Sequence, residues 1–325
     1  MTRDRKTVPR MQGLRPELDS RGKGVLKPTE GKEGQTLSGH SLLVRYANLV
    51  RLPHTLFALP FALVGTIYAS FSAPVGVRQV GLVLLAFTAA RFAAMGFNRI
   101  ADRLLDAKNP RTQGREIPAG RLSVTQAGLA VALASVTFVV AAGLLNRLCL
   151  YLSLPALAWI LAYSYTKRFT SWSHLWLGAS LAIAPVGGYV AVTGAWSAPA
   201  WTLLAIAGFV LLWVAGFDVF YALQDNDFDQ EHGLRSAVVL LGPARSVGLA
   251  KSLHYVAILL LFVFAYGARL GAPSYGGMVI AAGILFREHS LVTAHDLSQL
   301  DAAFFTMNGI MSVVVFAGML ADRLI

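Results

Sequence analysis

The chain has only one cysteine and few charged residues. Cys149 stands alone among 325 residues, so an intrachain disulfide is excluded. Charged side chains make up 14% of the chain and hydrophobic ones 55%, with a mean hydropathy of +0.57. A soluble domain carries more charge and less apolar surface than this. The composition therefore predicts a membrane protein.

The first forty residues lack the features of a signal peptide. They contain no apolar segment followed by a small-residue cleavage site, and they combine many charges with scattered Gly and Pro. This composition predicts a flexible, basic N-terminal tail over residues 1–44. The rest of the chain, 45–325, is expected to form one transmembrane domain, because its short loops leave no room for a second globular domain.

Long apolar runs fill this second part. They are continuous rather than alternating and are too long for barrel strands, so helices are the expected form. Runs of about 18 residues or more can cross a bilayer. The sequence therefore predicts an all-α membrane protein, a polytopic bundle of about nine transmembrane helices of which the eighth is the shortest: 54–72, 79–97, 123–145, 148–166, 173–194, 199–221, 247–268, 274–288 and 302–321.

The net charge of +11 could indicate nucleic-acid binding or membrane topology. The basic residues gather in the loops after the second, fourth and sixth spans, which alternate with poorer loops such as "TGAWSAPA". This alternation favours the positive-inside rule and argues against a nucleic-acid partner. We expect a multi-pass protein of the cell (inner) membrane, with the tail and the three basic loops in the cytoplasm and the C-terminus outside.

An acidic motif ends the second span. Asn98, Asp102 and Asp106 recur every four residues, which places them on one face of a helix. Ionised carboxylates near a bilayer are costly and usually face a cavity or a partner. The alternative is that the span simply ends here and the two aspartates pair with Arg99 or Arg103 among the lipid headgroups.

A second acidic motif closes the sixth span, on the same side of the membrane. Asp218, Tyr221, Asp225 and Asp229 lie at offsets of three, seven and eleven, which predicts another stripe on one helix. Several carboxylates without a His or Cys pattern favour Mg²⁺, which commonly bridges carboxylates and a phosphorylated substrate. The expected metal ligands are Asn98, Asp102, Asp106, Asp218, Asp225 and Asp229.

Basic residues flank both acidic motifs. Each one alone is explained by topology, but as a set beside two acidic stripes they favour binding of a diphosphate that the metal would not fully neutralise. The expected diphosphate-binding residues are Arg111, Arg115, Lys167, Arg168 and Arg235.

Two further arginines are expected to bind an acceptor. Arg91 lies seven residues before Asn98, two turns deeper in the span, and Arg51 stands at the mouth of the first span. An arginine at depth needs an anion, and a substrate carboxylate would bind it through two hydrogen bonds. The alternatives are that Arg91 bonds Asp218 or a backbone carbonyl and that Arg51 is a flanking anchor.

The histidines near span ends show no metal-site spacing: His54, His232, His289 and His295. The segment "FREHSLVTAHDLSQLD" between the last two spans could cover a site or could be an ordinary connector. Neither feature changes the functional prediction.

Three ordered motifs resemble the UbiA superfamily of intramembrane aromatic prenyltransferases. "NRIADRLLD" is similar to its Asn-x-x-x-Asp-x-x-x-Asp signature, "DVFYALQDNDFD" to its second signature, and "YSYTK" to its Tyr-x-x-x-Lys element. "NPRTQGREIPAG" is similar to a loop of the 4-hydroxybenzoate branch. The resemblance covers about residue 45 to the C-terminus. "VRLPHTLFALPFALVG", "RFAAMGFNRIADR" and "DAAFFTMNGIMSV" look most like the MqnP group of menaquinone biosynthesis.

The resemblance implies Mg²⁺-dependent transfer of a polyprenyl group from polyprenyl diphosphate to an aromatic acid, at the cytoplasmic face. Two acceptors of quinone biosynthesis stay open, 4-hydroxybenzoate and 1,4-dihydroxy-6-naphthoate. The metal and the cations would stabilise the departing diphosphate, and the tyrosines would stabilise the allyl cation, unless they only belong to an interfacial aromatic belt. The expected catalytic residues are Asp102, Asp225, Lys167, Tyr163 and Tyr221.

Two other functions compete with this one. A secondary transporter often has broken helices, and "APVGGYV" in the fifth span looks like such a break. A CDP-alcohol-type phosphotransferase could use an Asp-rich motif, but it would release no free diphosphate. A structural scaffold would have no use for two costly acidic stripes. The prenyl chain length and the oligomeric state stay open.

Overall fold

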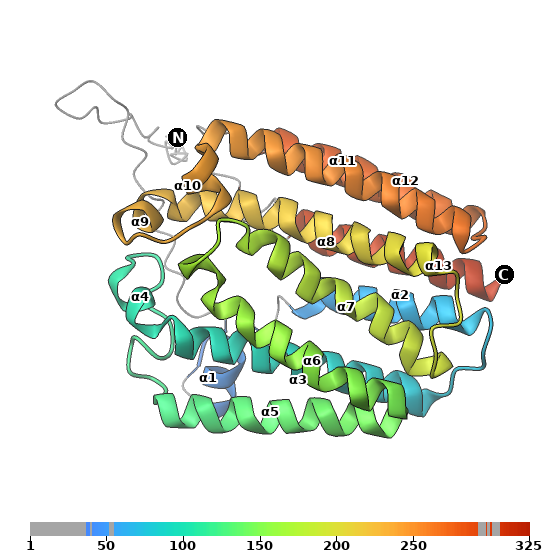
Figure 1. Cartoon of the computed structure of the whole chain (residues 1–325), viewed down its shortest axis with the longest axis horizontal. Coiled ribbons are helices and arrows are strands. Elements are labelled where there is room, and N and C mark those ends of the chain that lie inside the picture. The colour runs from blue at the N-terminus through green and yellow to red at the C-terminus, as the bar shows by residue number, and fades with distance from the viewer. Residues whose placement is uncertain (1–36, 40, 52–54, 292–296, 298–299, 301–305) are drawn as a thin grey trace, which may run out of the picture. The chain divides into compact units, whose positions relative to one another are not determined.

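The computed structural model describes residues 37–39, 41–51, 55–291, 297, 300 and 306–325. These residues belong to one compact unit that spans 32–325, and their regular structure is entirely helical (Figure 1). Most of the predicted tail, His54, His295 and most of the connector after residue 291 lie outside the described residues. The predicted boundary between tail and domain stays a prediction.

Each predicted span contains a long helix. Six of the nine are long and apolar enough to cross a membrane by length and hydropathy, within the described ranges, and α2 is a shorter apolar helix. The predicted all-helical membrane fold is confirmed, while the number of nine crossings stays a prediction. The helices are α2 (Thr55–Ser70), α3 (Val77–Ala101), α5 (Val124–Leu145), α6 (Arg147–Ala162), α7 (Ser173–Thr193), α8 (Ala200–Ala222), α11 (Pro243–Gly267), α12 (Ala272–Leu291) and α13 (Asn308–Leu324).

Short helices gather at one end of the bundle (Figure 1). They connect or extend the long helices and carry most of the polar motifs. In chain order they are α1 (Leu42–Leu49), α4 (Arg103–Lys108), the 3-10 helix η2 (Tyr163–Arg168), the 3-10 helix η3 (Leu223–Asp225), α9 (Asn226–Glu231) and α10 (Ala237–Leu241).

Helix α8 forms the centre of the bundle. It is apolar on every face, as expected of a helix surrounded by other helices. It packs against α7 and α11, and the fully buried Phe209 and Trp213 contact the ring of Phe61 from α2. This packing holds the end of α8, and the acidic motif that follows it, in a fixed position.

Helix α7 is continuous, so the break expected at "APVGGYV" is wrong. Pro185 lies inside α7, and the small residues around it serve helix packing instead. A Cβ added at Gly65 of α2 would overlap the carbonyl oxygen of Pro185, and one added at Gly188 would overlap that of Ala62. Small residues of this kind let two membrane helices approach closely. Helix α7 therefore lacks the break that favoured a transporter in the sequence.

Both acidic motifs are interrupted, which corrects the prediction of two unbroken stripes. Asp102 separates α3 from α4 with φ −97° and ψ 6°, and Asp225 precedes α9 with φ −98° and ψ 3°. These values lie in the sparsely allowed bridge region, where many active-site residues are found. We call these two interruptions, at Asp102 and at Asp225, the bends of the acidic motifs.

Candidate active site

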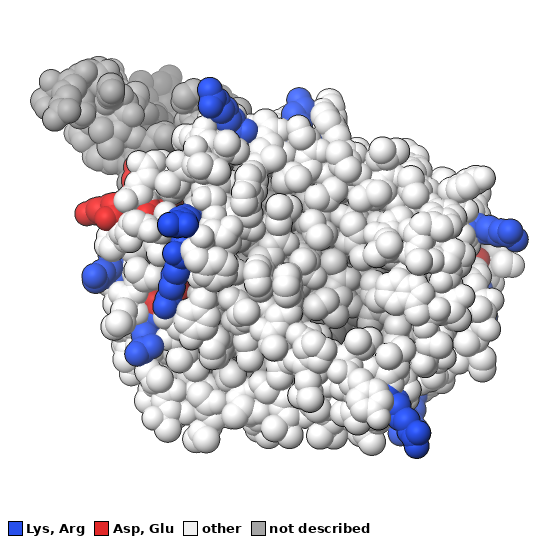
Figure 2. Space-filling view, in the orientation of Figure 1, with Lys and Arg blue, Asp and Glu red and all other residues white. Residues whose placement is uncertain are grey.

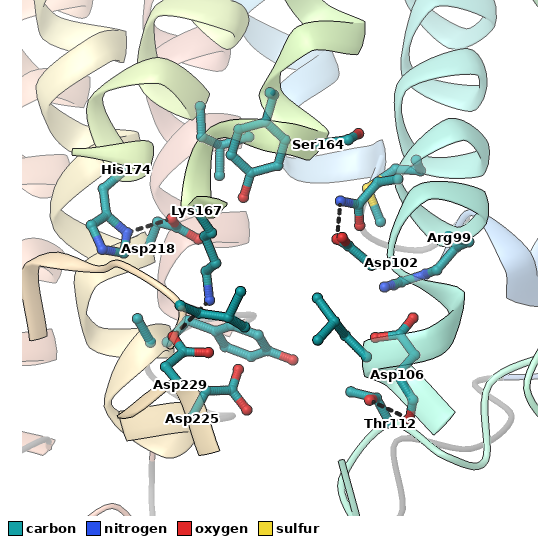
Figure 3. A pocket seen from close by; sticks show the side chains of 18 of the residues that line it. Arg99, Asp102, Asp106, Thr112, Ser164, Lys167, His174, Asp218, Asp225 and Asp229 are labelled. Atoms are coloured by element: carbon teal, nitrogen blue, oxygen red, sulfur yellow. Dashed lines mark hydrogen bonds and ion pairs between the residues drawn. The ribbon is translucent and has the colours of Figure 1, made fainter. Parts of the chain in front are cut away.

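A cavity of about 230 Å³ lies where the two bends meet, and we call it the polar chamber. Figure 3 shows Asp102 and Asp106 on one side of it, facing Asp218, Asp225 and Asp229 on the other. The structure thus brings together acidic residues that are more than 100 positions apart in the chain. The predicted residues that line it are Arg51, Arg91, Asn98, Asp102, Asp106, Arg111, Arg115, Tyr163, Lys167, Arg168, Asp218, Tyr221, Asp225 and Asp229.

Asp102 is held by two neighbours. Asn98 Nδ2 donates to Asp102 Oδ2 at 2.8 Å, and Arg168 Nη2 donates to Oδ1 at 3.4 Å. Arg103, an alternative partner from the sequence, donates to the carbonyl of Ile100 instead. Burial raises the pKa of Asp102, and the nearby charge on Asp106 raises this pKa further, while Arg168 opposes both effects.

Asp106 has one paired and one unpaired oxygen. Arg115 Nη1 donates to Oδ1 at 2.6 Å, whereas Oδ2 is buried and has no hydrogen-bond partner among the described residues. An orphaned carboxylate oxygen is costly to bury. A bound cation would remove that cost.

Arg111 crosses the chamber from the loop after α4 to the second motif. Its Nε and Nη2 donate to Asp225 Oδ1 and Oδ2 at 2.9 and 2.5 Å, and Asn109 Nδ2 adds a third bond to Oδ1 at 3.1 Å. Arg111 Nη1 also donates to the Tyr221 hydroxyl at 3.0 Å, and Arg51 Nη1 donates to the same oxygen at 3.2 Å. One loop therefore links the two acidic motifs.

The remaining two carboxylates have different partners. Lys167, at the end of the Tyr-x-x-x-Lys element, donates to Asp229 Oδ2 at 3.0 Å. His174, at the start of α7, lies with Nδ1 2.7 Å from Asp218 Oδ2. Lys167 brings a permanent positive charge, whereas His174 is charged only when protonated.

Arg235 does not belong to the chamber, which corrects its predicted diphosphate role. Its side chain is exposed, and Nη1 donates to the carbonyl of Phe169 at 2.8 Å. The chain turns at Gly233, whose φ of 65° is left-handed; Leu234 still lines the chamber, whereas the next residue, Arg235, does not. Arg235 instead braces the segment after Lys167, because its backbone N–H donates to the Lys167 carbonyl at 2.8 Å.

A second, apolar cavity of about 750 Å³ adjoins the polar chamber. We call it the apolar cavity; it lies between α3, α6, α7 and α8, and side chains such as Phe87, Leu152 and Leu211 line it. The two cavities share wall residues, so a single elongated molecule can occupy both. The shared residues are Arg91, Met95, Asn98, Tyr163, Leu177 and Leu181.

The donor set fits a hard divalent cation. Within the described ranges, no three acidic, His or Cys side chains converge into a ready-made ligand cluster, because each carboxylate lies against a basic or imidazole partner. Mg²⁺ does not need such a cluster, since it retains water and binds through one or two carboxylates plus substrate phosphates. The orphaned Asp106 oxygen is the observation that favours this fit.

Five polar lining residues were not predicted: Arg99, Asn109, Thr112, Ser164 and His174. Asn109 begins the "NPRT" loop, so its place beside a recognised motif was a usable signal. No sequence signal could have identified His174, because 44 residues separate it from Asp218 and only the packing of α7 on α8 brings them together.

Sequence comparison finds one family and many relatives. The profile of the UbiA prenyltransferase family matches residues 58–310. A 4-hydroxybenzoate octaprenyltransferase from Tolumonas auensis is 31% identical over 261 residues, covering 78% of this chain and 88% of the relative. Another, from Nitrosococcus oceani, is 34% identical over 283 residues, covering 85% of this chain and 96% of the relative.

Solved structures share the fold. A UbiA homolog from Aeropyrum pernix K1 in its apo form superposes with a TM-score of 0.75 at 32% identity, covering 83% of this chain and 98% of that one. A UbiA homolog from Archaeoglobus fulgidus, bound to DMAPP and Mg²⁺, has a TM-score of 0.67 at 20% identity, covering 86% of this chain and 99% of that one.

Proposed function

The chain belongs to the UbiA prenyltransferase family, and we propose that it transfers a polyprenyl group from polyprenyl diphosphate to a hydroxylated aromatic acid with the aid of Mg²⁺. One observation carries this proposal. The polar chamber, with its acidic motifs and cations, adjoins a larger apolar cavity. A molecule with a diphosphate head and a long apolar chain matches this pair of cavities.

The diphosphate would lie in the polar chamber. Asn98, Asp102, Asp106, Asp225 and Asp229 would hold Mg²⁺, which supplies positive charge that neutralises the leaving diphosphate. The Mg²⁺ and DMAPP bound by the Archaeoglobus homolog support the choice of cation and of donor class.

Four basic side chains of the chamber would bind the diphosphate oxygens directly. Each lies against a carboxylate, so the charges of these four pairs balance one another. Arginine suits this task because its planar donors match phosphate oxygens in pairs. The four are Arg111, Arg115, Lys167 and Arg168.

Aromatic and apolar walls would protect the allylic carbon as its bond to oxygen breaks. Tyr163 lines both cavities, and the Arg111 guanidinium lies 5.2 Å from the centroid of the Tyr221 ring. The faces of such rings attract positive charge. Excluding water from this region prevents hydrolysis of the reactive carbon.

Arg91 would bind the acceptor's carboxylate at the junction of the two cavities. The relatives named above act on 4-hydroxybenzoate by name, while the resemblance to the MqnP group favours a dihydroxynaphthoate. Both acceptors carry a ring hydroxyl and a carboxylate. We place the reaction in quinone biosynthesis, at the cytoplasmic face of the inner membrane.

An assay with the purified protein in micelles tests the proposal. With octaprenyl diphosphate, Mg²⁺ and each acceptor, we expect alkylated product and inorganic diphosphate in equal amounts, and no product with EDTA. Asp102→Ala and Asp225→Ala each lose about 100-fold or more in turnover. Lys108→Ala is the control, because this exposed cation lies outside the chamber. Product without free diphosphate, or full turnover by both Asp variants, would refute the proposal.

A further inference from the structure

Asp218 differs from the other carboxylates of the polar chamber in the charge of its partner. Its Oδ2 lies 2.7 Å from Nδ1 of His174, and no described residue hydrogen-bonds its Oδ1. Lys167, the permanent cation of this wall, is paired with Asp229 at 3.0 Å. The carboxylates that lie against a permanent cation are Asp102, Asp106, Asp225 and Asp229.

The environment of His174 assigns the proton on its ring. The backbone N–H of Ala237 points to Nε2 at 3.4 Å, and since an amide can only donate, Nε2 is the accepting nitrogen. Nδ1 then carries the proton of the neutral imidazole and donates it to Asp218 Oδ2. His174 is 1% exposed, so this arrangement is held by the surrounding packing. The carboxylate of Asp218 is therefore held in one orientation.

Asp218 is also too deep to share an ion with Asp225. Seven residues separate them, and an α-helix rises about 1.5 Å per residue, so they are about 10 Å apart along the axis. Oxygen ligands lie about 2.1 Å from Mg²⁺ and hence about 4 Å or less from one another. Asp218 lines the chamber together with Phe217 and Leu177, of which Leu177 is shared with the apolar cavity, and it interacts electrostatically with Tyr163 and Lys167.

We propose that Asp218, oriented by His174, accepts the hydroxyl proton of the aromatic acceptor during prenyl transfer, in place of the metal-ligand role expected from the sequence. This step rests on the proposed function. The open oxygen, Oδ1, faces a chamber into which the Asp218 side chain is 15% exposed. Figure 3 shows the His174–Asp218 pair on the chamber wall.

The step balances as follows. A ring carbon beside the hydroxyl bonds the allylic carbon while the allylic C–O bond breaks and the diphosphate leaves with the electron pair. The hydroxyl proton passes to Asp218, which leaves a neutral dienone. The alkylated ring carbon then loses its proton to the departed diphosphate, and Asp218 returns its proton to the oxygen. One proton and one diphosphate are released for each new C–C bond.

His174 is a positioning residue in this scheme. It occupies Oδ2, so the free oxygen is the one that points into the chamber. His174 also holds the Asp218 carboxylate in place without adding a permanent positive charge. Such a charge would reduce the ability of the carboxylate to accept a proton. Asparagine can place an N–H close to the position of Nδ1, whereas leucine cannot.

The first test separates proton acceptance from metal binding. Calorimetry measures Mg²⁺-dependent binding of farnesyl thiolodiphosphate, an unreactive donor analogue, to the detergent-purified protein. We expect Asp218→Asn to bind it within about threefold of wild type and Asp225→Asn to bind it about 30-fold more weakly. Equal weakening of both variants would make Asp218 a metal ligand and overturn the inference.

The second test uses acceptors of different acidity. With the parent hydroxy acid, Asp218→Asn loses about 100-fold in kcat, the range of a general base. With a ring-fluorinated acceptor, whose hydroxyl ionises more readily and which keeps one free ortho carbon, the loss falls to about tenfold or less. Equal losses on both acceptors, or no loss on either, would contradict proton acceptance.

The third test addresses His174. His174→Asn retains at least about tenfold more kcat than His174→Leu, while both bind the donor analogue as wild type does. Equal kcat values for His174→Asn and His174→Leu would show that His174 does not orient Asp218. Wild-type protein that alkylates no hydroxylated ring acid would instead refute the proposed function, so the two failures are distinguishable.

Discussion

Each carboxylate of the polar chamber lies against one basic or imidazole side chain, and that side chain limits its chemistry. Arg111 binds Asp225 through two nitrogens, so this pair resists rotation and sets the direction of both side chains. Asp106 keeps one buried oxygen without a hydrogen bond among the described residues. These contacts underlie the proposed division of the cavity into metal ligands, diphosphate-binding cations and the Asp218 base.

Arg91→Ala tests the acceptor role at this scale. Loss of a charged hydrogen-bonding partner should raise the KM for the aromatic acid about 30-fold while the KM for the prenyl donor changes about twofold or less. Steady-state kinetics with each substrate varied in turn measures both values. Arg78→Ala is a matched control, because Arg78 lies on the same helix, is exposed and bonds the Leu144 carbonyl.

Equal effects of Arg91→Ala on both substrates would remove the acceptor role. A larger effect on the donor would place Arg91 with the diphosphate-binding cations instead.

Local spacing predicted the side chains that lie within a few residues of one another in the sequence. Asn98, Asp102 and Asp106 share a face because residues four apart are neighbours on a helix. His174 could not be found in this way, because its contact with Asp218 arises from tertiary packing. The prediction for Arg235 failed for the opposite reason: it is near Asp229 in the sequence, but its side chain is exposed and bonds the Phe169 carbonyl instead of lining the chamber.

At the scale of elements, two features shape the site: the bends in the acidic motifs and the close contact of α2 with α7. The helix positions followed from long apolar runs, which any spanning helix requires. The bends could not be predicted, because acidic residues at offsets of four or seven fit an unbroken helix equally well. In the structure α3 ends at Ala101, directly before Asp102, and α8 ends at Ala222, with a 3-10 turn leading to Asp225.

The α2–α7 contact gives a prediction about stability. Gly65→Ala and Gly188→Ala each place a methyl group against a backbone carbonyl of the other helix. Such overpacking should lower the free energy of unfolding by about 1–3 kcal/mol. Thermal unfolding of the detergent-solubilised variants measures this change. Gly187→Ala is the control, because a Cβ there meets no atom within 4 Å.

An equal loss of stability in Gly65→Ala, Gly188→Ala and Gly187→Ala would contradict the close packing of α2 on α7 as its cause. A stability of Gly187→Ala at or slightly above wild type agrees with it, because alanine favours a helix more than glycine does.

At the scale of the whole molecule, the charged residues are kept away from the middle of the helical bundle. Figure 2 shows Lys, Arg, Asp and Glu gathered toward the ends of the long helices, with an uncharged band between them. This distribution suits a bilayer, and the polar chamber lies at one end of it, beside an apolar cavity of about 750 Å³. The basic loops predict which side faces the cytoplasm. A charged head and a lipid-soluble chain can therefore meet the same enzyme at the membrane boundary.

The central claim is that the two acidic motifs hold one Mg²⁺–diphosphate unit between them. Calorimetric binding of farnesyl thiolodiphosphate with Mg²⁺ to wild type, Asp102→Asn, Asp225→Asn and the double variant tests it most directly. We predict that each single variant weakens binding about 30-fold and that the double variant is little weaker than either, since residues acting as one unit are not additive. Fully additive losses, or unchanged binding in one single variant, would contradict it.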